Sequence, residues 1–514
     1  MPGWLSNAVF YEVYPQSFND TNGDGIGDIP GITQKLDYIL KLGCNAIWLN
    51  PCFDSPFKDA GYDVRDYKKV APRYGTNEDL IRLFGEAHAR GMHVILDLVA
   101  GHTSEEHEWF RQSGKAQPNE YSGRYVWSDF WLSDMDGRPF IAGECERNGV
   151  YMLNFFKCQP ALNYGFLEPK KPWQMAMDSP DALATREALK DVIRFWLQAG
   201  ADGFRVDMAN SLVKGDDEHK SGTCQVWQDI RSMLDEEFPE AALVSEWSDP
   251  IQAINGGGFH VDFYLDHPDN GYHSLMREGE KSYFAVNGQT AEHFLSEYLP
   301  RYEATRENGY VSLITCNHDT PRASWTLKER ELKLAYAFIL TMPGVPFIYY
   351  GDEIGMRYLA DLPTKEGGYT RTGTRTPMQW DHTRNMGFSD ADADQLYLPQ
   401  DPAEDAPTAE AAMADPESIY AVVKQVAALR AQTPDLQADE KLEILHDGCG
   451  EDRVLIYRRG AHVMAVNPSD REQTVAAAGS TAGKEPVWVL GKSRMTEDGL
   501  QIGAQSFAVY EMPG

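Results

Sequence analysis

The sequence predicts an α/β fold: a (β/α)8 TIM barrel with a small domain inserted after its third strand and a C-terminal antiparallel β domain. Short apolar, β-branched or aromatic runs alternate with longer helical patterns, which is typical of β/α units around a parallel sheet. About 80 residues separate the third run from the next helical pattern, whereas such connections usually span about 2 to 6 residues. The last part of the chain alternates apolar and polar residues in short runs. An open doubly wound sheet is the alternative for the first pattern.

Eight runs are expected to form the strands of the barrel. They are AVFYEVY (8–14), AIWL (46–49), VILDLV (94–99), GFRVD (203–207), LVSE (243–246), VDFYL (261–265), YVSLITC (310–316) and PFIYY (346–350). The clearest helix follows Ser179, a suitable N-cap, with Pro180 in its first turn and Gly200 as its stop. In such a barrel the active site lies at the C-terminal ends of the strands.

The long connection after the third strand carries its own aromatic and apolar content, so it is expected to fold as an inserted domain. The acidic, Ala- and Pro-rich segment 389–418 is interpreted as an exposed connection. After one more helix, five alternating runs predict the C-terminal β domain. We divide the chain into a barrel (1–102 and 176–435), an inserted domain (103–175) and a C-terminal β domain (436–514).

Composition narrows the class of protein. With 42% apolar and 24% charged residues, and no apolar run of about 18 residues, the chain is expected to be a globular protein without a membrane span. The N-terminus lacks the pattern of a signal peptide, and the seven cysteines are scattered without a C-x-x-C pair, which predicts reduced cysteines and a cytoplasmic location. The net charge of −31 argues against nucleic acid or a membrane surface as a partner.

Ionisable residues collect at the predicted strand ends. Asp207 ends the fourth strand, Glu246 ends the fifth, and the pair His318 and Asp319 follows the seventh. Arg205 lies two residues before Asp207 and therefore on the same face of its strand. Any one of these carboxylates alone could cap a helix or form a structural ion pair. Three on the catalytic rim of one barrel indicate an active site instead.

Clustered carboxylates without thiols or a phosphate-binding loop indicate glycoside chemistry. One ionised carboxylate can attack the anomeric carbon while a second, protonated one gives its proton to the leaving oxygen. Arg205 is expected to keep Asp207 ionised, and the neighbouring carboxylates are expected to raise the pKa of Glu246.

A set of motifs in order carries a family resemblance. They are FYEVYPQSF, DAGYDVRDY, DLVAGHTS, GFRVD, the Glu of LVSEW, NHD, GVPFIYYGDEIGM and RTPMQWD. In this combination the sequence resembles the α-amylase family of glycoside hydrolases, family thirteen, and within it the oligo-1,6-glucosidase and α-glucosidase branch. The resemblance runs from the first predicted strand to residue 381, and the tail fits the C-terminal β domain of that family.

The resemblance implies roles for individual residues. Asp207 is then the nucleophile, Glu246 the general acid/base, and Asp319 the residue that grips the sugar hydroxyls. Tyr62 is expected to stack beneath the bound glucose, and the rest of its pocket would come from Asp59, His102, Arg205 and His318. The family retains anomeric configuration, which requires the nucleophile and acid/base carboxyl groups to lie about 5 to 5.5 Å apart. For Arg375 two interpretations are left open: it contributes to the pocket, or it forms a structural ion pair.

Three positions depart from the family pattern. Gly101 stands where calcium-dependent amylases have an Asn that ligates calcium, so that calcium site is not expected here. Ala161 replaces the Asp of the Q-P-D-L-N stretch typical of the branch. Met208 follows the nucleophile, where the branch has a small or hydroxylated residue for α-1,4 linkages and Val for α-1,6 linkages. The linkage preference is therefore left open.

The expected function is that of a retaining α-glucosidase that hydrolyses terminal α-glucosidic bonds of short oligosaccharides or α-glucosides through a covalent glucosyl-enzyme intermediate. The alternatives on the same active site are an endo-acting α-amylase and a glucosyl transferase or isomerase. A more distant alternative is a non-catalytic sugar-binding or partner subunit of the same fold. The sequence leaves open whether the enzyme hydrolyses or transfers the glucosyl group, and whether it acts at the ends or within a glucan. It also leaves open the chain length of the substrate and the oligomeric state of the protein.

The stretch DTNGDGIGD follows the first predicted strand and begins like an EF-hand calcium loop. Gly31 stands at the twelfth position, where that motif requires a bidentate Glu, and no helix precedes the loop, so a calcium sensor is not expected. The α-glucosidase branch carries a structural metal in this loop. The resemblance therefore implies one structural calcium ion, whose ligands would be Asp20, Asn22, Asp24, the carbonyl of Ile26 and Asp28. A metal-free turn rich in Asp and Gly is the alternative.

Overall fold

The computed structural model describes residues 1–128, 137–476 and 483–512. It confirms the barrel: all eight predicted runs contribute strands to one parallel sheet, in the order β12-β11-β10-β9-β5-β2-β1-β13. In chain order they are β1 Phe10–Val13, β2 Ala46–Leu49, β5 His93–Val99, β9 Gly203–Asp207, β10 Ala242–Ser245, β11 Val261–Phe263, β12 Tyr310–Ser312 and β13 Phe347–Tyr349. A bridge between Ile314 and Phe347 joins the two ends of the sheet, so it closes as a barrel and not as an open doubly wound sheet.

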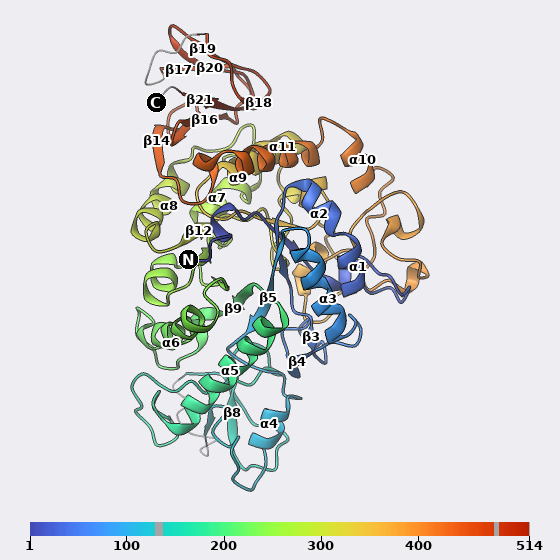
Figure 1. The fold of residues 1–514 in the computed structure, drawn as a ribbon, viewed down its shortest axis with the longest axis vertical. Helices are drawn as coiled ribbons and strands as arrows, with labels where there is room; N and C mark the ends of the chain where they lie inside the picture. Colours follow the sequence, from blue (N-terminus) through green and yellow to red (C-terminus); the bar gives the residue numbers. More distant parts are fainter. Residues whose placement is uncertain (129–136, 477–482, 513–514) are drawn as a thin grey trace.

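Helices cover the outside of the barrel (Figure 1). The α-helices are α1 Ile29–Gln34, α2 Leu36–Leu42, α3 Asn77–His88, α4 Glu108–Ser113, α5 Pro180–Ala199, α6 Ser221–Glu237, α7 Gly271–Met276, α8 Glu292–Thr305, α9 Glu329–Thr341, α10 Ala409–Ala414 and α11 Ile419–Gln432. Helix α5 has the predicted ends, since the Ser179 hydroxyl accepts a hydrogen bond from the backbone N–H of Ala182 and Gly200 is left-handed at φ +116°.

Two short sheets lie within long β-to-α connections of the barrel. Strands β6 (Trp127–Ser128), β8 (Val150–Met152) and β7 (Phe140–Ile141) form an antiparallel sheet within the predicted insertion. The second β-to-α loop contains the pair β3 (Phe53–Asp54) and β4 (Asp66–Val70). Residues 129–136 of the predicted insertion lie outside the described residues.

The five predicted C-terminal runs form one antiparallel sheet in the order β14-β15-β16-β21-β18. Its strands are β14 Leu442–Asp447, β15 Leu455–Arg459, β16 His462–Asn467, β18 Trp488–Leu490 and β21 Ser506–Glu511. A second sheet of β17 (Gln473–Val475), β20 (Gly499–Ile502) and β19 (Ser493–Thr496) was not predicted. Its strands are three or four residues long, too short to show a period of two. The C-terminal sheets and the α4–β8 region lie at opposite ends of the molecule (Figure 1).

Two buried arginines join the end of α9 to later parts of the chain. The guanidinium of Arg430, in α11, donates hydrogen bonds to the carbonyls of Leu340 and Met342 at 2.9 and 3.0 Å. Arg459, at the end of β15, donates to the carbonyls of Thr341 and Met342, each at 3.2 Å. The last carbonyls of a helix have no partner within the helix, so these two side chains supply the missing donors.

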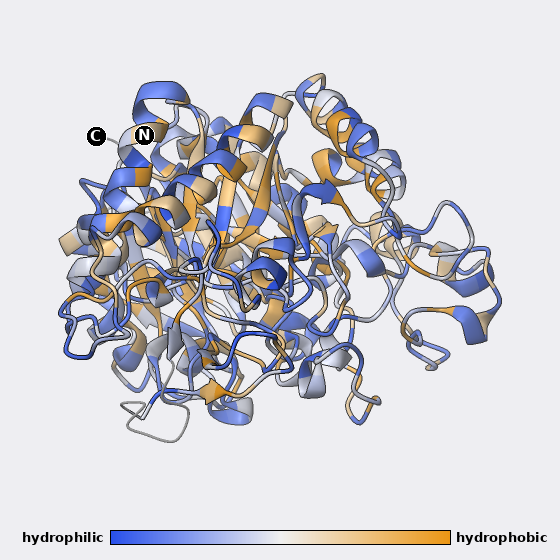
Figure 2. Ribbon diagram, turned by 90° about the horizontal axis from the view of Figure 1, so that it is seen from below, coloured by the Kyte–Doolittle hydropathy of each residue, from blue (hydrophilic) through white to orange (hydrophobic). Residues whose placement is uncertain are grey.

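Apolar residues colour the central strands and the inward faces of the helices, while the outer loops are mainly polar (Figure 2). The core is correspondingly continuous across the barrel and the first layer of helices. Among the described residues, no helix combines the length and the apolar character needed to cross a membrane.

Candidate active site

The barrel brings the predicted carboxylates to one place. Asp207 ends β9, Glu246 follows β10 directly, and Asp319 lies in the loop after β12. All three line a pocket of about 280 Å³. Of the residues predicted to bind sugar, Asp59, Tyr62 and His102 also line this pocket. Arg205 and His318 are buried behind it and contact its lining residues.

Arg205 is the cation that these carboxylates share. One of its terminal nitrogens lies 2.8 Å from Asp97 Oδ1 and 3.5 Å from Asp207 Oδ1, and the other lies 2.9 Å from Glu246 Oε2. Strand register explains the arrangement, because Asp97 of β5 is the Cα partner of Arg205 in the parallel pair. The guanidinium is 1% exposed, so its contacts are poorly screened by solvent. One buried positive charge therefore compensates three carboxylates.

The protonation of Asp207 differs from the sequence-based expectation. Burial, followed by the charge of Glu246, raises the pKa of Asp207 well above its ordinary value, and Arg205 offsets this only in part. Glu246 has the shorter contact with Arg205 and also accepts the backbone N–H of Met208 at 2.9 Å. In the free protein Asp207 therefore holds a proton more readily than an ordinary carboxyl group does, whereas attack by Asp207 needs its ionised form.

Asp319 has the opposite electrostatic environment. Arg371 and Arg375 each place a guanidinium nitrogen near its Oδ1, at 3.0 and 2.8 Å. His318 lies behind it, with Nε2 3.3 Å from Asp319 Oδ2. Burial alone would raise the pKa of Asp319, but His318 and the two arginines together lower it below its ordinary value. Asp319 is therefore ionised, and Arg375, left open by the sequence, is a buried ion-pair partner of a pocket residue.

A chain of hydrogen bonds fixes the tautomer of His318. The Tyr62 hydroxyl donates to Asp97 at 3.1 Å, and since it has one proton, it accepts from His318 Nε2 at 2.6 Å. The other ring nitrogen, Nδ1, lies 2.8 Å from Glu12 Oε1. Burial raises the pKa of Glu12 and lowers that of His318, so a protonated Glu12 carboxyl can donate to a neutral imidazole. The ring then keeps its N–H at Nε2, on the side of Asp319.

Asp59 is 3% exposed, and its Oδ2 accepts a hydrogen bond from the Gln159 side chain at 2.7 Å. Burial raises the pKa of Asp59 to about 6 despite this bond and the nearby Arg371. An unfolded Asp carboxyl has a pKa near 3.9. Between about pH 4 and pH 6 the folded protein therefore keeps the Asp59 proton, whereas the unfolded chain has lost it. Its contribution to stability therefore falls as pH rises from about 4 to about 6, by roughly 3 kcal/mol in all.

Replacement of Asp59 by Asn should accordingly raise the melting temperature at pH 7 and leave it nearly unchanged at pH 4. The amide keeps the shape of the side chain but carries no charge to desolvate. Calorimetric scans of both proteins across this pH range would measure the difference. Asp319→Asn is the matched control in the same pocket: because its carboxyl has a lowered pKa, this change should lower the melting temperature at pH 7. The raised pKa of Asp59 would be contradicted if the substitution lowered the melting temperature at pH 7 while leaving it unchanged at pH 4.

His102 lies at the pocket wall with both ring nitrogens engaged. Its Nε2 donates to the Tyr62 carbonyl at 3.2 Å, and Nδ1 accepts from the Asn154 amide at 3.1 Å. Asn154 in turn accepts from the Lys214 ammonium at 3.0 Å. A side chain at Gly101 would meet the Asn154 amide nitrogen at 2.6 Å. In this structure a side chain at position 101 would therefore require the Asn154 amide and the Ser211 hydroxyl to shift.

Met208 turns the chain sharply after Asp207. Its φ of +43° is left-handed, a conformation that a long side chain rarely adopts. The turn directs the Met208 N–H to Glu246 and places the side chain in the pocket lining. Met208 therefore follows Asp207 in the chain and hydrogen-bonds Glu246 through its backbone. It also stands at the position that sets the glycosidic linkage preference in the branch that the sequence resembles.

The predicted calcium loop is built from turns closed by its own side chains. Asp20, Asn22 and Asp24 each accept a hydrogen bond from the backbone N–H two residues ahead, at 2.9 to 3.0 Å. Asp20 also accepts from the Ser389 hydroxyl at 2.6 Å, and Asp28 caps helix α1 through the backbone N–H of Gly31. Within the described parts of the chain, no three His, Cys, Asp or Glu side chains converge as a metal-binding group.

Several residues of the site were not singled out from the sequence. They are Glu12, Asp97, Asn154, Gln159 and Arg371. A signal existed for two of them, because Glu12 and Asp97 are charged residues within otherwise apolar barrel strands. Arg371 lies in a short 3-10 segment, Tyr369–Thr374. The sequence of this segment has no hydrophobic periodicity that could have shown where the Arg371 side chain lies.

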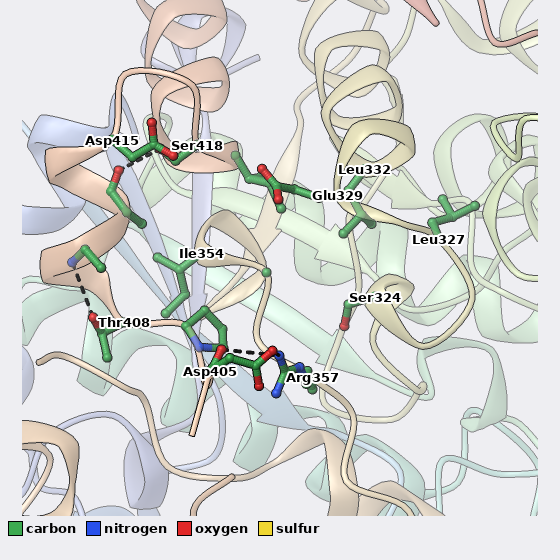
Figure 3. Close-up of a pocket in the computed structure, with 15 residues that line it drawn as sticks. Ser324, Leu327, Glu329, Leu332, Ile354, Arg357, Asp405, Thr408, Asp415 and Ser418 are labelled. Carbon is green, nitrogen blue, oxygen red and sulfur yellow. Dashed lines mark hydrogen bonds and ion pairs between the residues drawn. The ribbon is translucent and has the colours of Figure 1, made fainter. Parts of the chain in front are cut away.

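A second cavity, of about 590 Å³, lies between the start of α9 and helices α10 and α11 (Figure 3). Its charged and polar groups engage one another: Arg357 lies 2.8 Å from Asp405, and the Thr408 hydroxyl caps α10 (Figure 3). It contains none of the predicted site residues. The pocket at the three carboxylates is therefore the candidate active site.

Known proteins share both the sequence and the fold. The model of the alpha amylase catalytic domain matches residues 12–439. The trehalose synthase/amylase TreS of Mycolicibacterium smegmatis is 35% identical over 437 residues, covering 77% of this chain and 70% of that protein. A glucan 1,6-alpha-glucosidase of Streptococcus pneumoniae is 32% identical over 537 residues, covering 93% of each chain. An inactive double mutant of MutB in complex with isomaltulose has a TM-score of 0.82 at 25% identity, over 99% of this chain and 100% of that chain.

The match to the family model spans most of the chain, and it includes the strands that position Asp207, Glu246 and Asp319. The relatives extend over most of the chain as well. The chain therefore belongs to the alpha-amylase family of glycoside hydrolases.

Proposed function

We propose that this protein is a retaining α-glucosidase that removes glucose from the ends of short α-linked oligosaccharides or α-glucosides. The observation that carries the proposal is the arrangement of Asp207, Glu246 and Asp319 in one small pocket around the buried Arg205. At about 280 Å³ the pocket is near the lower end of the range of about 300–1,000 Å³ for ligand sites. A pocket of this size suits a single terminal sugar ring.

In the first step Asp207 Oδ attacks the anomeric carbon, and the bond from that carbon to the leaving oxygen breaks. Protonated Glu246 supplies the proton that the leaving oxygen takes up, and Asp207 attacks in its ionised form. In the second step Glu246 removes a proton from water, whose oxygen replaces Asp207 on the anomeric carbon. The ionised Asp319 accepts hydrogen bonds from sugar hydroxyls as the ring flattens, and His318 holds the Tyr62 hydroxyl beside it.

The experiment that tests this function is a panel of maltose, isomaltose, sucrose and trehalose with time-resolved identification of the products. Release of α-glucose as the first product supports retention and exo action. Longer fragments appearing first would indicate an endo-acting enzyme, and accumulated transfer products would contradict simple hydrolysis.

Glucosyl transfer to a sugar hydroxyl is the second candidate. Relatives named trehalose synthase/amylase and a MutB structure named trehalulose synthase favour it. Transfer uses the same first step, and a sugar hydroxyl then takes the place of water. The ratio of transfer product to free glucose as sugar concentration rises separates the two functions.

Glu246→Gln should abolish hydrolysis of natural disaccharides and spare the first step with an aryl α-glucoside, whose leaving group needs no proton. The glucosyl-enzyme then accumulates because water is not activated. Added azide, which needs no general base, should restore turnover and yield α-glucosyl azide. The product is identified by NMR. A β-azide product, or no rescue with a folded protein, would contradict the role of Glu246. Glu240→Gln is the control, because Glu240 precedes the N-terminal end of β10, the end opposite Glu246, and accepts a hydrogen bond from the backbone N–H of Gly3.

We also propose one structural calcium ion in the first β-to-α loop, held by Asp20, Asn22, Asp24, the carbonyl of Ile26 and Asp28. The donor chemistry fits, since all five groups offer the oxygen ligands that calcium prefers. The ion would replace the amide hydrogen bonds of the loop and neutralise its clustered charge. When bound it would stabilise the loop without entering the reaction.

Removal of the ion with a chelator should lower the melting temperature by a few degrees and change kcat less than twofold at temperatures below unfolding. Calorimetry and an aryl α-glucoside assay measure the two effects, with excess calcium restoring the first. Asp24→Ala should make the melting temperature insensitive to chelator. A metal-free protein with an unchanged melting temperature would refute the proposal.

A further inference from the structure

Asp262, in the middle of β11, carries a buried carboxyl group that takes no part in the proposed reaction steps. It is 0% exposed. The neighbouring Phe263 points into the barrel, because its ring stacks on Trp48 of β2 at 5.4 Å and meets Phe347 of β13 edge-on at 4.8 Å. Side chains alternate between the two faces of a strand, so Asp262 points out of the barrel, toward its outer layer. A carboxyl group is costly to bury there, so compensating interactions are expected.

A single oxygen of Asp262 binds the chain on both sides of Glu246. Ser245, the last residue of β10, is the Cα partner of Asp262 in the parallel pair. Asp262 Oδ1 accepts a hydrogen bond from the Ser245 hydroxyl at 2.6 Å. The same oxygen accepts the backbone N–H groups of Trp247 and Ser248 at 3.2 and 3.4 Å. Asp262 therefore fixes the backbone directly before and after the proposed acid/base residue.

The backbone after Glu246 makes a tight turn. Ser248 has a φ of +60°, a left-handed conformation that is uncommon outside glycine. Its hydroxyl accepts the backbone N–H of Leu265 at 3.2 Å. Trp247, in the same turn, lines the catalytic pocket together with Glu246. A change in the turn would therefore move part of the pocket wall, and the hydrogen bonds to Asp262 hold the turn in place.

Glu246 is held from the side of β9 as well. Strand β10 lies between β9 and β11 in the sheet. The Glu246 N–H donates to the Val206 carbonyl at 3.0 Å, and the Glu246 carbonyl accepts the N–H of Ala209 at 3.3 Å. Asp262 supplies the contacts from β11. The acid/base residue is thus fixed between the strand that ends in Asp207 and the strand that carries Asp262.

The Asp262 carboxyl group is neutral at neutral pH. Burial raises its pKa to about 8, and the charge of Asp249 in the same loop adds to the rise. The hydrogen bonds from Ser245, Trp247 and Ser248 oppose this shift only in part. Within the described residues, Asp262 Oδ2 has no hydrogen-bond partner. A neutral side chain with one accepting oxygen therefore fits the site, and an asparagine would keep both the shape and the acceptor.

We propose that Asp262 is a positioning residue for Glu246, and that its hydrogen bonds hold the acid/base carboxyl group within reach of the leaving oxygen. The inference rests on the proposed function, because it assumes the role of Glu246. Proton transfer requires the two heavy atoms to lie about 2.6 to 3.2 Å apart, and a displacement of about 1 Å can slow a reaction about a hundredfold. A carboxyl group that only stabilised the loop would have no such effect on proton transfer.

Leaving groups of different acidity separate the two roles. Phenol leaves phenyl α-glucoside with a proton from Glu246, whereas dinitrophenol leaves without one. Asp262→Ala should lower kcat/KM for phenyl α-glucoside by about a hundredfold and that for dinitrophenyl α-glucoside by less than about threefold. Its kcat for the dinitrophenyl substrate should fall, because water is then poorly activated, and added azide should restore it. Asp262→Asn should stay within about threefold of the parent on both substrates.

Glu331→Ala is the matched control. Glu331, in α9, is 3% exposed, and its carboxyl group accepts the backbone N–H groups of Val286 and Lys328 at 2.8 and 2.7 Å. Its loss should lower the melting temperature and leave the ratio of the two kcat/KM values unchanged. Should Asp262→Ala fail to fold, Ser245→Ala removes one of the hydrogen bonds to Asp262. It should change the ratio in the same direction by a smaller factor.

Hydrogen exchange at the Trp247 and Ser248 amides, measured by mass spectrometry, gives a readout that does not depend on turnover. Exchange should be faster in Asp262→Ala than in the parent and return to the parental rate in Asp262→Asn. An equal fall of kcat/KM for both leaving groups, or unchanged exchange, would overturn the positioning role and leave the proposed function standing. A parent protein without turnover on any α-glucoside would instead reject the proposed function, and this role of Asp262 with it.

Discussion

Asp207→Ala is expected to lower kcat for an aryl α-glucoside by about 10⁵-fold, with the protein still folded. The loss follows from the proposed role of Asp207: without its carboxylate, no glucosyl-enzyme forms, and the remaining groups can only assist slow attack by water. Steady-state kinetics measures the loss. Mass spectrometry after incubation with a slow fluorinated glucosyl donor should find a glucosyl adduct on Asp207 in the parent and none in the variant.

The control for this change lies at the other end of the same strand. Asp202, just before β9, accepts hydrogen bonds from His93 and from the backbone N–H of Val94, at the face of the barrel opposite the pocket. Asp202→Asn should lower stability and leave kcat within twofold. If Asp207→Ala kept the turnover of the parent, the assigned nucleophile would be wrong.

Arg205→Met is expected to lower the free energy of unfolding by about 3–5 kcal/mol and kcat by about a thousandfold. The side chain is buried and touches Asp97, Asp207 and Glu246, so its removal leaves buried carboxylates without their cation. Denaturant unfolding and turnover of an aryl α-glucoside measure the two losses. Part of the stability should return at low pH, where protons replace the missing charge.

A second change separates the two roles of Arg205. Adding Asp97→Leu to Arg205→Met removes one of the stranded carboxylates and should recover stability without recovering activity. Arg194→Met, which removes a surface ion pair with Glu237, is the control and should cost less than about 1 kcal/mol. An Arg205→Met protein as stable as the parent would show that the carboxylates do not depend on this cation.

The barrel could be predicted from the sequence because each of its strands is a distinct apolar run with a helix pattern after it. Strand ends also placed Asp207 and Glu246, since residues at the C-terminal ends of parallel strands meet at one rim. Helix α5 was predictable to the residue because Ser179, Pro180 and Gly200 each have a specific role at a helix end.

What could not be predicted depends on contacts between distant segments. Arg371 reaches Asp319 from an irregular segment, and sequence patterns report periodicity, not the path of a loop. The pKa of Asp207 was expected to stay low because Arg205 is near in sequence. In the structure Glu246 has the closer contact with that guanidinium, and burial outweighs the attraction left for Asp207.

The two arginines that cap α9 also bear on how the protein is made. Helix α9 leads into the last barrel strand, but the donors for its terminal carbonyls come from Arg430 and Arg459, much later in the chain. During synthesis the N-terminal part emerges first, so these carbonyls have only water as a partner until Arg430 of α11 and then Arg459 of the C-terminal sheet have left the ribosome. Truncation at residue 435 would keep the catalytic carboxylates and still remove Arg459. The C-terminal sheet thus contributes, through Arg459, one of the two side chains that cap a barrel helix, so the last domain to be synthesised adds to the stability of the first.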